Sequence, residues 1–488
     1  MAEHVDIAII GAGLAGIGVA YHVQEKLPGK SFALFEARDR IGGTWDIFKY
    51  PGLRSDVDMH LYGYSFAPWT RESGVASASN IMAYLNETLD AFDLRRHIRF
   101  GHELGRAEWD SGTALWTLHF ADGREVTCRW LQMCAGYYHY DSGYRPEFPG
   151  EADFEGEIIH PQEWDECTSV AGKRVVVIGS GATAVTILPE LVKDAAHVTQ
   201  LQRSPTYVFA GPKEPKLTKL LRTVLPQPAA YHAVRKKDLF FDKVRHNLVH
   251  SKPDKLKQMI RDAAKEHLPE GYDFETHFQP DYAPGKQRMC FAPDGDFYQA
   301  VAKDNCEVVT DRIRTFTEAG IELESGRHLD ADVVITATGL RMRMFEPGTL
   351  VVDGKPITAS ETWLYKGILL SGVPNFSLTV GSLVHSYTLR VELIARFVCR
   401  VLAHMESKGL AIATPTLPKP VEEMESRPFT EDFNSGYVLR AIPDFPRTTS
   451  ESPWINQQPY HESVREFTAP LEDGHLRFSA PVGSRNAA

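Results

Sequence analysis

The sequence predicts an α/β protein built on two separate parallel sheets. Two apolar runs, at 5–10 and 175–178, each lead into a glycine-rich turn, and a stretch with apolar residues at helical spacing follows each turn. Strand, glycine turn, helix and second strand make a βαβ unit, whose two strands lie parallel. At 488 residues the chain also exceeds the size at which one hydrophobic core stops growing, about 250–300 residues. We therefore expect two domains, each with its own βαβ unit.

The composition limits the classes of partner. A formal net charge of -11 and a pI near 6.0 argue against nucleic acid, or an anionic membrane, as a general partner, although local basic patches could bind phosphate. No stretch approaches the roughly 20 apolar residues of a transmembrane helix. The run VDIAII is too short for a signal-peptide core and carries Asp6, so we expect a cytoplasmic protein.

Changes in residue composition and in the spacing of apolar residues along the chain suggest the order of the domains. We expect residues 1–145 to form the first part of one domain and residues 146–330 to form the second domain. Residues 331–488 would return to the first domain and wrap over it. Within the second domain, 213–280 combines apolar residues at helical spacing with many Lys and Arg, which predicts a helical insertion. Its basic faces are either solvated or available to a membrane surface or a partner.

The first glycine loop has the pattern G-x-G-x-x-G, at Gly11, Gly13 and Gly16. These glycines allow a tight turn, close approach of a pyrophosphate, and close packing of the helix that follows. Glu36 ends the second strand of this unit, where a carboxylate bonds ribose hydroxyls and repels a 2′-phosphate. The alternative is a glycine turn without a ligand.

The second glycine loop has the pattern G-x-G-x-x-A. The loop and the first turn of its helix contain Gly179, Gly181, Ala182, Thr183 and Ala184. Arg203 and Ser204 end the next strand, at the position that distinguishes NADP from NAD, and a guanidinium suits a 2′-phosphate there. A surface arginine without a ligand is the alternative. The two loops together predict FAD in the first domain and NADPH in the second.

A flavin enzyme that uses NADPH can pass electrons to a disulfide, to an external acceptor or to oxygen. The six cysteines form no C-x-x-C pair, so the disulfide route lacks its reactive group. We expect reduced, mostly buried thiols.

Two further stretches carry chemistry-bearing residues. In GGTWDIFKYPGLRSD, at 42–56, Gly42 and Gly43 allow the backbone to run against a cofactor, and Trp45 can pack beside a flavin ring. Asp56 falls on a nearby loop, and we expect Gly43, Thr44, Trp45 and Asp56 to contact FAD. In FEGEIIHPQEWD, at 154–165, His160 suggests either a metal site or a packed hinge. No Cys, Asp or second His stands at ligand spacing, which disfavours a metal.

Both stretches resemble the fingerprints of type I Baeyer–Villiger monooxygenases, which are class B flavoprotein monooxygenases. The first pattern is matched at Gly42, Gly43, Trp45, Tyr50, Pro51, Gly52 and Asp56. The second is matched at Phe154, Gly156, His160, Trp164 and Asp165. The resemblance extends over nearly the whole chain and is greatest to the branch with the ethionamide-activating monooxygenases of actinobacteria.

The resemblance implies roles that spacing alone does not. It implies that 154–165 connects the two domains and couples them as NADP shifts, with direct catalysis by His160 as an alternative. It also implies that Arg288, on a loop of the second domain, is the active-site arginine and faces Asp56. A fixed guanidinium would stabilise an anionic flavin C4a-peroxide and the adduct that it forms with a carbonyl.

The implied activity is the NADPH- and O2-dependent conversion of hydrophobic ketones to esters or lactones, with oxygenation of sulfides or thioamides as a second activity. The alternatives are a flavin monooxygenase that oxygenates S or N, and an NADPH-dependent flavin reductase. The segment 373–390 departs from the family, because Val384, His385 and Tyr387 stand in place of Asn, Ala and Trp. We expect His385 and Tyr387 to reshape a substrate pocket, with a packed His385 as the alternative.

Overall fold

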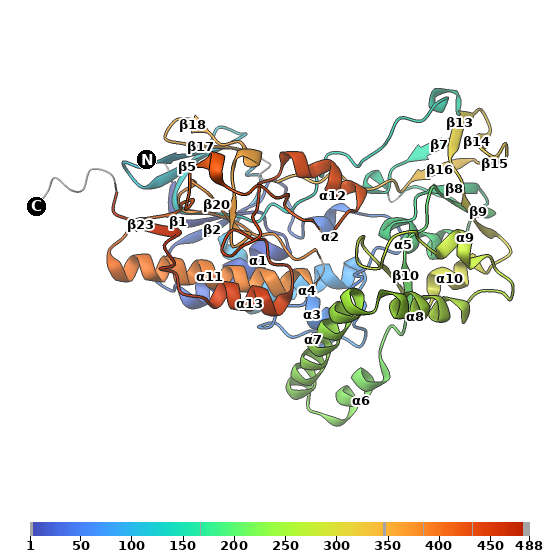
Figure 1. The fold of residues 1–488 in the computed structure, drawn as a ribbon, viewed down its shortest axis with the longest axis horizontal. Helices are drawn as coiled ribbons and strands as arrows, with labels where there is room; N and C mark the ends of the chain where they lie inside the picture. Colours follow the sequence, from blue (N-terminus) through green and yellow to red (C-terminus); the bar gives the residue numbers. More distant parts are fainter. Residues whose placement is uncertain (1–2, 166, 345–347, 384, 432, 482–488) are drawn as a thin grey trace, which may run out of the picture.

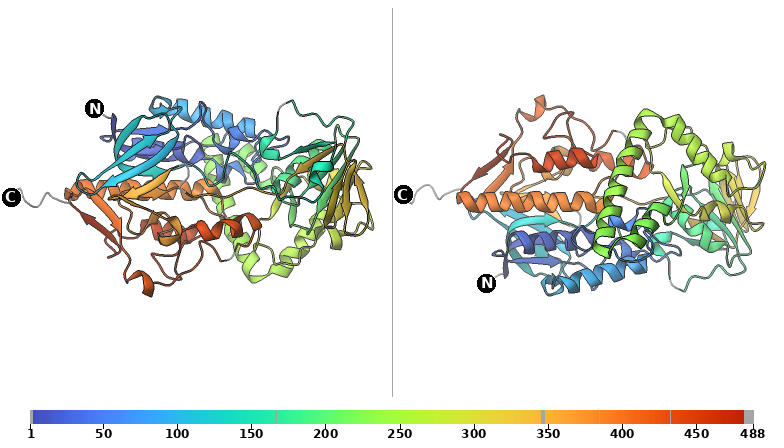
Figure 2. Two further views of the ribbon diagram at one scale, coloured as in Figure 1. Left: turned by 90° about the horizontal axis from the view of Figure 1, so that it is seen from above. Right: turned by 90° about the horizontal axis from the view of Figure 1, so that it is seen from below.

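The centre of the first domain is a parallel pair of strands, β1 (Glu3–Ile10) and β2 (Phe32–Phe35), connected by α1 (Leu14–Lys26). β2 and the second half of β1 are buried on both faces, which is why the sequence there is continuously apolar. The computed structural model describes residues 3–165, 167–344, 348–383, 385–431 and 433–481. The two sheets lie towards opposite ends of the long axis (Figures 1 and 2).

The first sheet has nine strands in the described part of the chain, in the order β18-β17-β4-β5-β6-β1-β2-β3, with β21 paired to β6. Its other strands are β3 (Ile98–Arg99), β4 (Leu104–Asp110), β5 (Leu115–Phe120), β6 (Glu125–Met133), β17 (Thr349–Val352), β18 (Lys355–Pro356) and β21 (Phe376–Leu378). β4, β5 and β6 form an antiparallel meander in which Trp116 lies opposite both Trp109 and Cys128. The last three strands come from the return segment, as expected for a discontinuous domain.

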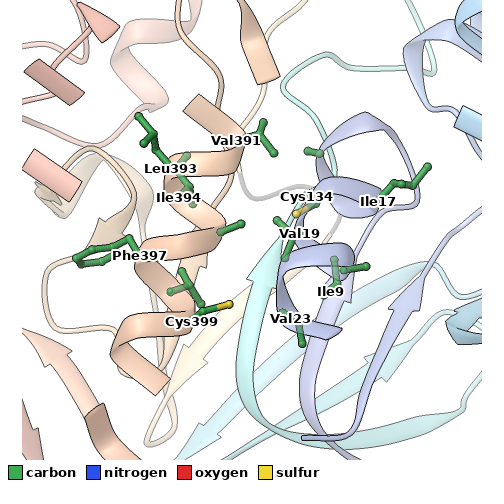
Figure 3. Close-up of a cluster of buried hydrophobic side chains, with 14 of the residues drawn as sticks. Ile9, Ile17, Val19, Val23, Cys134, Val391, Leu393, Ile394, Phe397 and Cys399 are labelled. Atoms are coloured by element: carbon green, nitrogen blue, oxygen red, sulfur yellow. The ribbon is translucent and has the colours of Figure 1, made fainter. Parts of the chain in front are cut away.

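α1 packs against α11 (Tyr387–Lys408) on one face of this sheet, and α4 (Ala78–Ala91) joins the same core. Figure 3 shows Val391 and Cys399 of α11 on the side of that helix that faces α1, which contributes Val19 and Val23. Each such buried side chain stabilises the fold by about 1.5–3 kcal/mol. The shorter elements are α2 (Thr44–Ile47), α3 (Met59–Tyr62), β19 (Leu364–Tyr365), β20 (Leu369–Leu370), β22 (Ile412–Pro415), α12 (Gly436–Ala441), α13 (Tyr460–Thr468) and β23 (Leu476–Ser479).

The second sheet is parallel throughout, in the order β12-β9-β8-β16-β7. Its strands are β7 (Glu157–Ile159), β8 (Arg174–Ile178), β9 (His197–Gln202), β12 (Cys306–Thr310) and β16 (Val333–Thr336). α5 (Ala182–Leu191) connects β8 to β9 and completes the second βαβ unit. Around it lie β10 (Val208–Gly211), β11 (Cys290–Pro293), α10 (Asp296–Val301), β13 (Ile313–Thr317), β14 (Gly320–Leu323) and β15 (His328–Asp330).

The chain crosses between the sheets twice, and the two crossing segments lie side by side. The backbone N–H of His139 donates to Arg341 O at 2.9 Å, and that of Arg343 donates to Tyr137 O at 3.1 Å. β16 lies before the second crossing and pairs with β7 and β8. The sequence interpretation placed this strand in the return segment that begins at residue 331, and that boundary is wrong because the chain leaves the second sheet only after Thr336.

The helical insertion consists of α6 (Lys216–Val224), α7 (Gln227–Ser251), α8 (Pro253–Lys265) and α9 (Phe274–Phe278). α8 packs against β10 of the second domain, but α7 also packs against the first domain. The described helices include none that is both long and apolar enough to cross a membrane.

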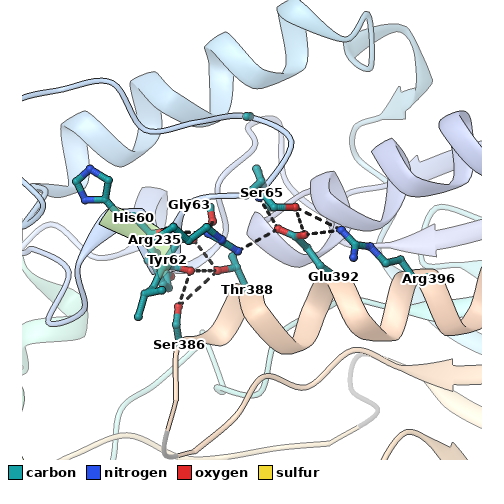
Figure 4. Close-up of polar contacts among 12 residues, drawn as sticks. His60, Tyr62, Gly63, Ser65, Arg235, Ser386, Thr388, Glu392 and Arg396 are labelled. Carbon is teal, nitrogen blue, oxygen red and sulfur yellow. Dashed lines mark hydrogen bonds and ion pairs between the residues drawn. The ribbon is translucent and has the colours of Figure 1, made fainter. Parts of the chain in front are cut away.

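A partly buried polar network fixes α7 on the first domain (Figure 4). Nη1 of Arg235 on α7 donates to the carbonyl oxygens of His60 at 2.7 Å and Gly63 at 3.1 Å. Glu392 of α11, which is buried, accepts from the backbone N–H of Ser65 at 2.6 Å. Buried charges are tolerated only with such partners, so this contact is specific to one placement of α7.

Candidate functional site

The first glycine loop closes tightly between β1 and α1. Gly11 has φ +103°, and a Cβ there would lie 2.6 Å from Cys134 O. A Cβ on Gly16 would overlap Gly11 O, so the helix can approach the strand only without a side chain. Gly13 precedes α1 in extended backbone with no side-chain cap, which leaves the first helical N–H groups open to a ligand.

Glu36 lies where β2 ends and is 8% exposed. Its Oε2 accepts from the backbone N–H of Ala12 at 2.8 Å, and its Oε1 accepts from that of Arg38 at 3.1 Å. The carboxylate therefore fixes the glycine loop and still lines the cavity beside it.

Residues of the first fingerprint (42–56) line the same cavity as Glu36. Gly43 has φ +53°, in the left-handed region that favours glycine, and a Cβ there would lie 3.6 Å from the Cα of Gly13, so the two glycine turns are neighbours. Thr44 Oγ1 shares a hydrogen bond with Tyr140 OH at 2.9 Å. The indole N–H of Trp45 donates to Tyr62 OH at 2.8 Å.

The end of the first fingerprint touches the second domain. Gly52 has φ +77°, and a Cβ there would lie 2.6 Å from Thr186 O in α5. Tyr50 packs against the core of the second domain, and burial raises the pKa of its hydroxyl to about 12. Arg54 pairs with Asp296 of α10. This fingerprint therefore forms part of the domain interface.

The second glycine loop repeats the geometry of the first. Gly179 has φ +136°, and a Cβ there would overlap Ala337 O, whereas a Cβ on Gly181 would meet no atom within 4 Å. Ala182 and Thr183 begin α5, and Ala184 is buried in its core. The open face at Gly181 is thus available to a ligand.

Arg203 and Ser204 follow β9 at the rim of the same cavity. Both are exposed, and Arg203 has no hydrogen bond or ion pair with any residue that the structure describes. Ser180 Oγ donates to Ser204 O at 3.0 Å and orders this turn. A free guanidinium on an ordered turn suits an anionic group.

Arg288 meets Asp56 across the domain interface. Nη2 of Arg288 donates to Asp56 Oδ2 at 2.7 Å, and Nε donates to the same oxygen at 3.2 Å. The Asp56 carboxylate outweighs the effect of burial and raises the pKa of Arg288, which fixes the positive charge. Tyr437 lies nearby, and burial raises the pKa of its hydroxyl to about 12, so it stays protonated at neutral pH.

The second fingerprint is mainly a structural element next to β7. Phe154 is buried, and a Cβ on Gly156 would lie 2.6 Å from Asp332 O, so only glycine lets this chain pass β16. Trp164 packs on the core of the second domain. Asp165 is exposed and accepts from the backbone N–H of Cys167 at 2.9 Å.

His160 lies between the two crossing segments. Its Nδ1 accepts from the backbone N–H of Gln162 at 3.2 Å, so the proton is on Nε2, which donates to Gly339 O at 3.2 Å. A Cβ on Gly143, in the first crossing segment, would overlap the imidazole ring. Burial lowers the pKa of His160, which keeps the ring neutral. These contacts pack the ring between the two segments, and a role as a hinge stays a prediction.

The predicted pocket residues lie where α11 begins. His385 is 5% exposed and its Nδ1 pairs with Asp242 of α7, while its Nε2 has no partner in the described chain. Tyr387 is half-buried and contacts the ring of Tyr137. Val384 lies outside the described residues. His385 is thus packed and paired, although it also lines the cavity.

One cavity of about 1180 Å³ joins these parts. The predicted residues that line it are Gly11, Gly13, Glu36, Gly43, Thr44, Trp45, Asp56, Gly179, Gly181, Ala182, Thr183, Arg203, Ser204, Arg288, His385 and Tyr387. The predicted residues outside its lining are Gly16, Phe154, Gly156, His160, Trp164, Asp165 and Ala184. His160 borders a smaller pocket together with Tyr50 and Thr183, which also line the large cavity.

Sequence reasoning missed the contribution of the C-terminal segment. Ser435, Tyr437 and Arg440 also line the cavity, and the guanidinium of Arg440 lies 3.4 Å from the centre of the Tyr144 ring. No motif marks these residues.

A cluster of possible metal ligands comes from segments far apart in the sequence, so the spacing of residues could not predict it. Asp58, His60 and Asp238 bring possible metal-ligand atoms within 4.8 Å of one another. Lys237 Nζ lies 2.7 Å from Asp238 Oδ1 and already supplies a positive charge there.

Comparison with known proteins agrees with this geometry. The family model described as flavin-binding monooxygenase-like matches residues 4–269, more than half of the chain. The FAD-containing monooxygenase EthA of Mycobacterium tuberculosis is 43% identical over 491 residues, covering 99% of this chain and 100% of that protein. The probable FAD-binding monooxygenase AlmA of Acinetobacter baylyi is 38% identical over 484 residues, covering 98% and 97%. The solved structure of an oxidized steroid monooxygenase bound to NADP aligns with a TM-score of 0.78 and 25% identity, covering 98% of this chain and 100% of that one.

These similarities confirm the predicted fold class, with two dinucleotide-binding domains, and the resemblance stated from the fingerprints. They extend over the whole chain, including the segments that carry both glycine loops. The chain is a flavin monooxygenase and belongs to the flavin-binding monooxygenase-like family.

Proposed function

We propose that the protein is an FAD-containing, NADPH- and O2-dependent Baeyer–Villiger monooxygenase. Its substrates would be hydrophobic ketones, which it converts to esters or lactones, and it would also oxygenate sulfides or thioamides. The observation that carries the proposal is the Arg288–Asp56 pair, because it lies on the wall of the cavity that both glycine loops line.

The first loop would hold FAD and the second NADP. Gly11 permits the tight turn, Gly13 leaves the uncapped N–H groups of α1 open to a pyrophosphate, and Glu36 suits ribose hydroxyls. Gly181 leaves the corresponding room at α5, and Arg203 suits a 2′-phosphate. When bound and reduced by NADPH, the flavin supplies the activated oxygen.

Arg288 would provide a fixed positive charge for the oxygen transfer. Asp56 orients the guanidinium through two hydrogen bonds to one oxygen, which leaves Nη1 free of that carboxylate. A preorganised cation stabilises the negative charge that develops when an oxygen nucleophile attacks a carbonyl, by up to about 3–4 kcal/mol. The role of Arg288 is therefore electrostatic, and that of Asp56 is to orient it.

The second fingerprint would couple the domains. His160 joins the first crossing segment to Gly339 of the second, so movement of the second domain must displace both. We assign residues 1–145 and the return segment to the FAD domain and the part between them to the NADP domain. We move the second boundary from residue 330 to just after Thr336, since β16 pairs in the second sheet.

The test is isotope transfer from molecular oxygen. Purified holoprotein is supplied with NADPH, ¹⁸O₂ and an aryl alkyl ketone, and in a parallel reaction with an aryl alkyl sulfide. We expect an ester that carries one labelled oxygen, and a labelled sulfoxide. Arg288→Ala should retain its flavin and lose ester formation by about 100- to 1000-fold, and Arg288→Lys should lose less.

Each other outcome identifies an alternative. Labelled sulfoxide without ester would indicate an enzyme that oxygenates S or N. NADPH oxidation with an added electron acceptor under nitrogen, and no label in any organic product under oxygen, would indicate a reductase. Normal ester production by Arg288→Ala would overturn the role of Arg288 but not the reaction.

A further inference from the structure

α6 and α7 form a pair of helices, here called the arm (residues 216–251), that lies outside the two sheets, at the lower margin of the molecule in Figure 1. The helices are joined by a hydrogen bond from Lys237 to Thr218. The arm has the largest group of exposed apolar side chains in the described chain. Exposed apolar patches of this kind mark interaction sites.

α6 carries a stripe of apolar side chains that faces away from α7. Leu217, Leu220 and Val224 follow at spacings of three and four, which places them on one face of the helix. They are 45%, 55% and 62% exposed. Thr218, whose side chain meets α7, is buried and lies on a different face. The apolar face of this amphipathic helix is thus uncovered by any described residue.

α7 carries both buried and exposed apolar side chains. Its inner face carries Tyr231 and Val234, which are buried against the body of the protein. Phe240, Phe241 and Val244 lie outside that contact and are 64%, 54% and 44% exposed. Phe240 and Phe241 touch each other, with ring centres 5.7 Å apart, and more than half of each side chain is exposed. The arm therefore exposes apolar side chains on both of its helices.

Charge distinguishes the arm from the rest of the chain. The arm contains eight Lys or Arg and two Asp, whereas the whole chain has a net charge of -11. Lys216, Lys219, Lys236 and Lys243 are exposed and form no ion pair with the residues that the structure describes. Lysines beside an uncovered apolar face are complementary to an anionic surface that is apolar beneath.

We propose that the arm docks on the surface of an anionic lipid bilayer. Phe240, Phe241 and the apolar side chains of α6 would enter the boundary between head groups and acyl chains, and the four lysines would pair with lipid phosphates. A stable protein interface takes about 20–30 residues a side, whereas a few apolar side chains with basic neighbours suffice for reversible binding to a bilayer. The observations therefore favour a membrane over a second copy of the chain.

The arm also contacts the wall of the cavity. Asp242, on the inner face of α7, pairs with His385, which lines the cavity. A docked bilayer would thus lie about one helix diameter, roughly 10–12 Å, from that wall. Apolar substrates dissolved in the membrane would reach the enzyme at this face. This consequence rests on the proposed function, but the docking itself does not.

The test is flotation of the holoenzyme with vesicles. We expect binding to vesicles of phosphatidylglycerol mixed with phosphatidylcholine, weaker binding to phosphatidylcholine alone, and loss of binding at high salt. Neutralisation in K236Q and K243Q should weaken partitioning about fivefold per lysine, and F240S/F241S by about tenfold or more. Val421→Ser, at an apolar residue that is 52% exposed outside the arm, is the matched control and should bind normally.

A second reporter makes the result independent of folding defects. Trp placed by Phe240→Trp should shift its emission to shorter wavelength when anionic vesicles are added. Equal flotation of all variants, or no shift, would overturn the proposal. A lipid-free oligomer that dissociates in F240S/F241S would also overturn it, in favour of a protein interface. Turnover of a water-soluble ketone should be unchanged in every arm variant, so failure of the proposed reaction is scored separately.

Discussion

Nε2 of His160 donates a hydrogen bond to Gly339 O at 3.2 Å, which joins the second fingerprint to the segment by which the chain returns to the first domain. The same ring packs on Gly143 in the other crossing segment. One neutral imidazole therefore holds both connections between the domains.

Replacing His160 by Ala should uncouple the enzyme, so that more NADPH is oxidised for each molecule of substrate that is oxygenated. The variant leaves Gly339 O and the Gln162 N–H without partners, so we expect a loss of about 1–3 kcal/mol in stability and a higher ratio of NADPH consumed to product formed. Flavin content should not change. His160→Gln, which retains a donor and an acceptor, should recover part of the coupling, and His119→Ala, in the first sheet, is the control. Normal coupling in His160→Ala would remove the hinge role.

Gly181 should be needed for NADPH binding, whereas Gly179 should be needed for the stability of the second domain. A Cβ on Gly181 meets no protein atom within 4 Å, so Gly181→Ala should lower stability by no more than about 1 kcal/mol. It should still raise the Kd of NADPH by about tenfold or more, because the methyl group occupies the space for the pyrophosphate. Gly179→Ala, with φ +136° and backbone contact at Ala337, should destabilise the second domain itself. Thermal unfolding and NADPH titration distinguish the two, and unchanged binding in Gly181→Ala would contradict the proposed placement.

Arg203 should determine the choice of nicotinamide cofactor. Removal of a charged hydrogen-bond donor to a phosphate costs about 1.5–3 kcal/mol, so Arg203→Ala should raise KM for NADPH by about 10- to 100-fold. KM for NADH should not change. Arg314→Ala, on β13 of the same domain, is the matched control. An equal effect on both cofactors would show that Arg203 does not contact the 2′-phosphate.

His22 should make stability depend on pH. It is 2% exposed at the α1–α11 contact, and burial lowers its pKa from 6.5 to about 3. The unfolded chain therefore binds a proton that the folded chain excludes, so stability falls as pH drops below about 6.5. Between pH 8 and pH 5, His22→Met should lose about 2 kcal/mol less of its unfolding free energy than the natural chain. Denaturant titration at both pH values measures this, and His461→Met, at a half-exposed side chain, should behave like the natural chain.

The sequence was sufficient for those parts of the fold that depend on local chemistry. Gly11 and Gly179 mark tight turns because no other residue fits beside Cys134 and Ala337, and their strands are continuously apolar because they are buried on both faces. The family could be identified because its two fingerprints are short local patterns of residues at fixed spacing.

Other features depend on contacts between distant segments, which have no local pattern. Nothing near Asp242 indicates that it pairs with His385, or that Tyr437 enters the cavity. β16 could not be assigned to a sheet, because a short apolar strand fits either one. The position of α7 depends on Arg235 reaching backbone oxygens of α3 and the residue after it, a contact that sequence spacing cannot reveal.

The adjacent crossing segments make the second domain an inserted module with neighbouring ends. A module of this kind can be exchanged for that of a relative by recombination, because the host ends need not move. A hybrid enzyme would therefore combine the nicotinamide cofactor preference of one parent enzyme with the oxygenation reaction of the other. α6 and α7 are the parts of such a graft that must be matched to a new host, because Arg222 of α6 is bonded to Glu72 and Arg235 of α7 to His60 and Gly63, all in the first domain.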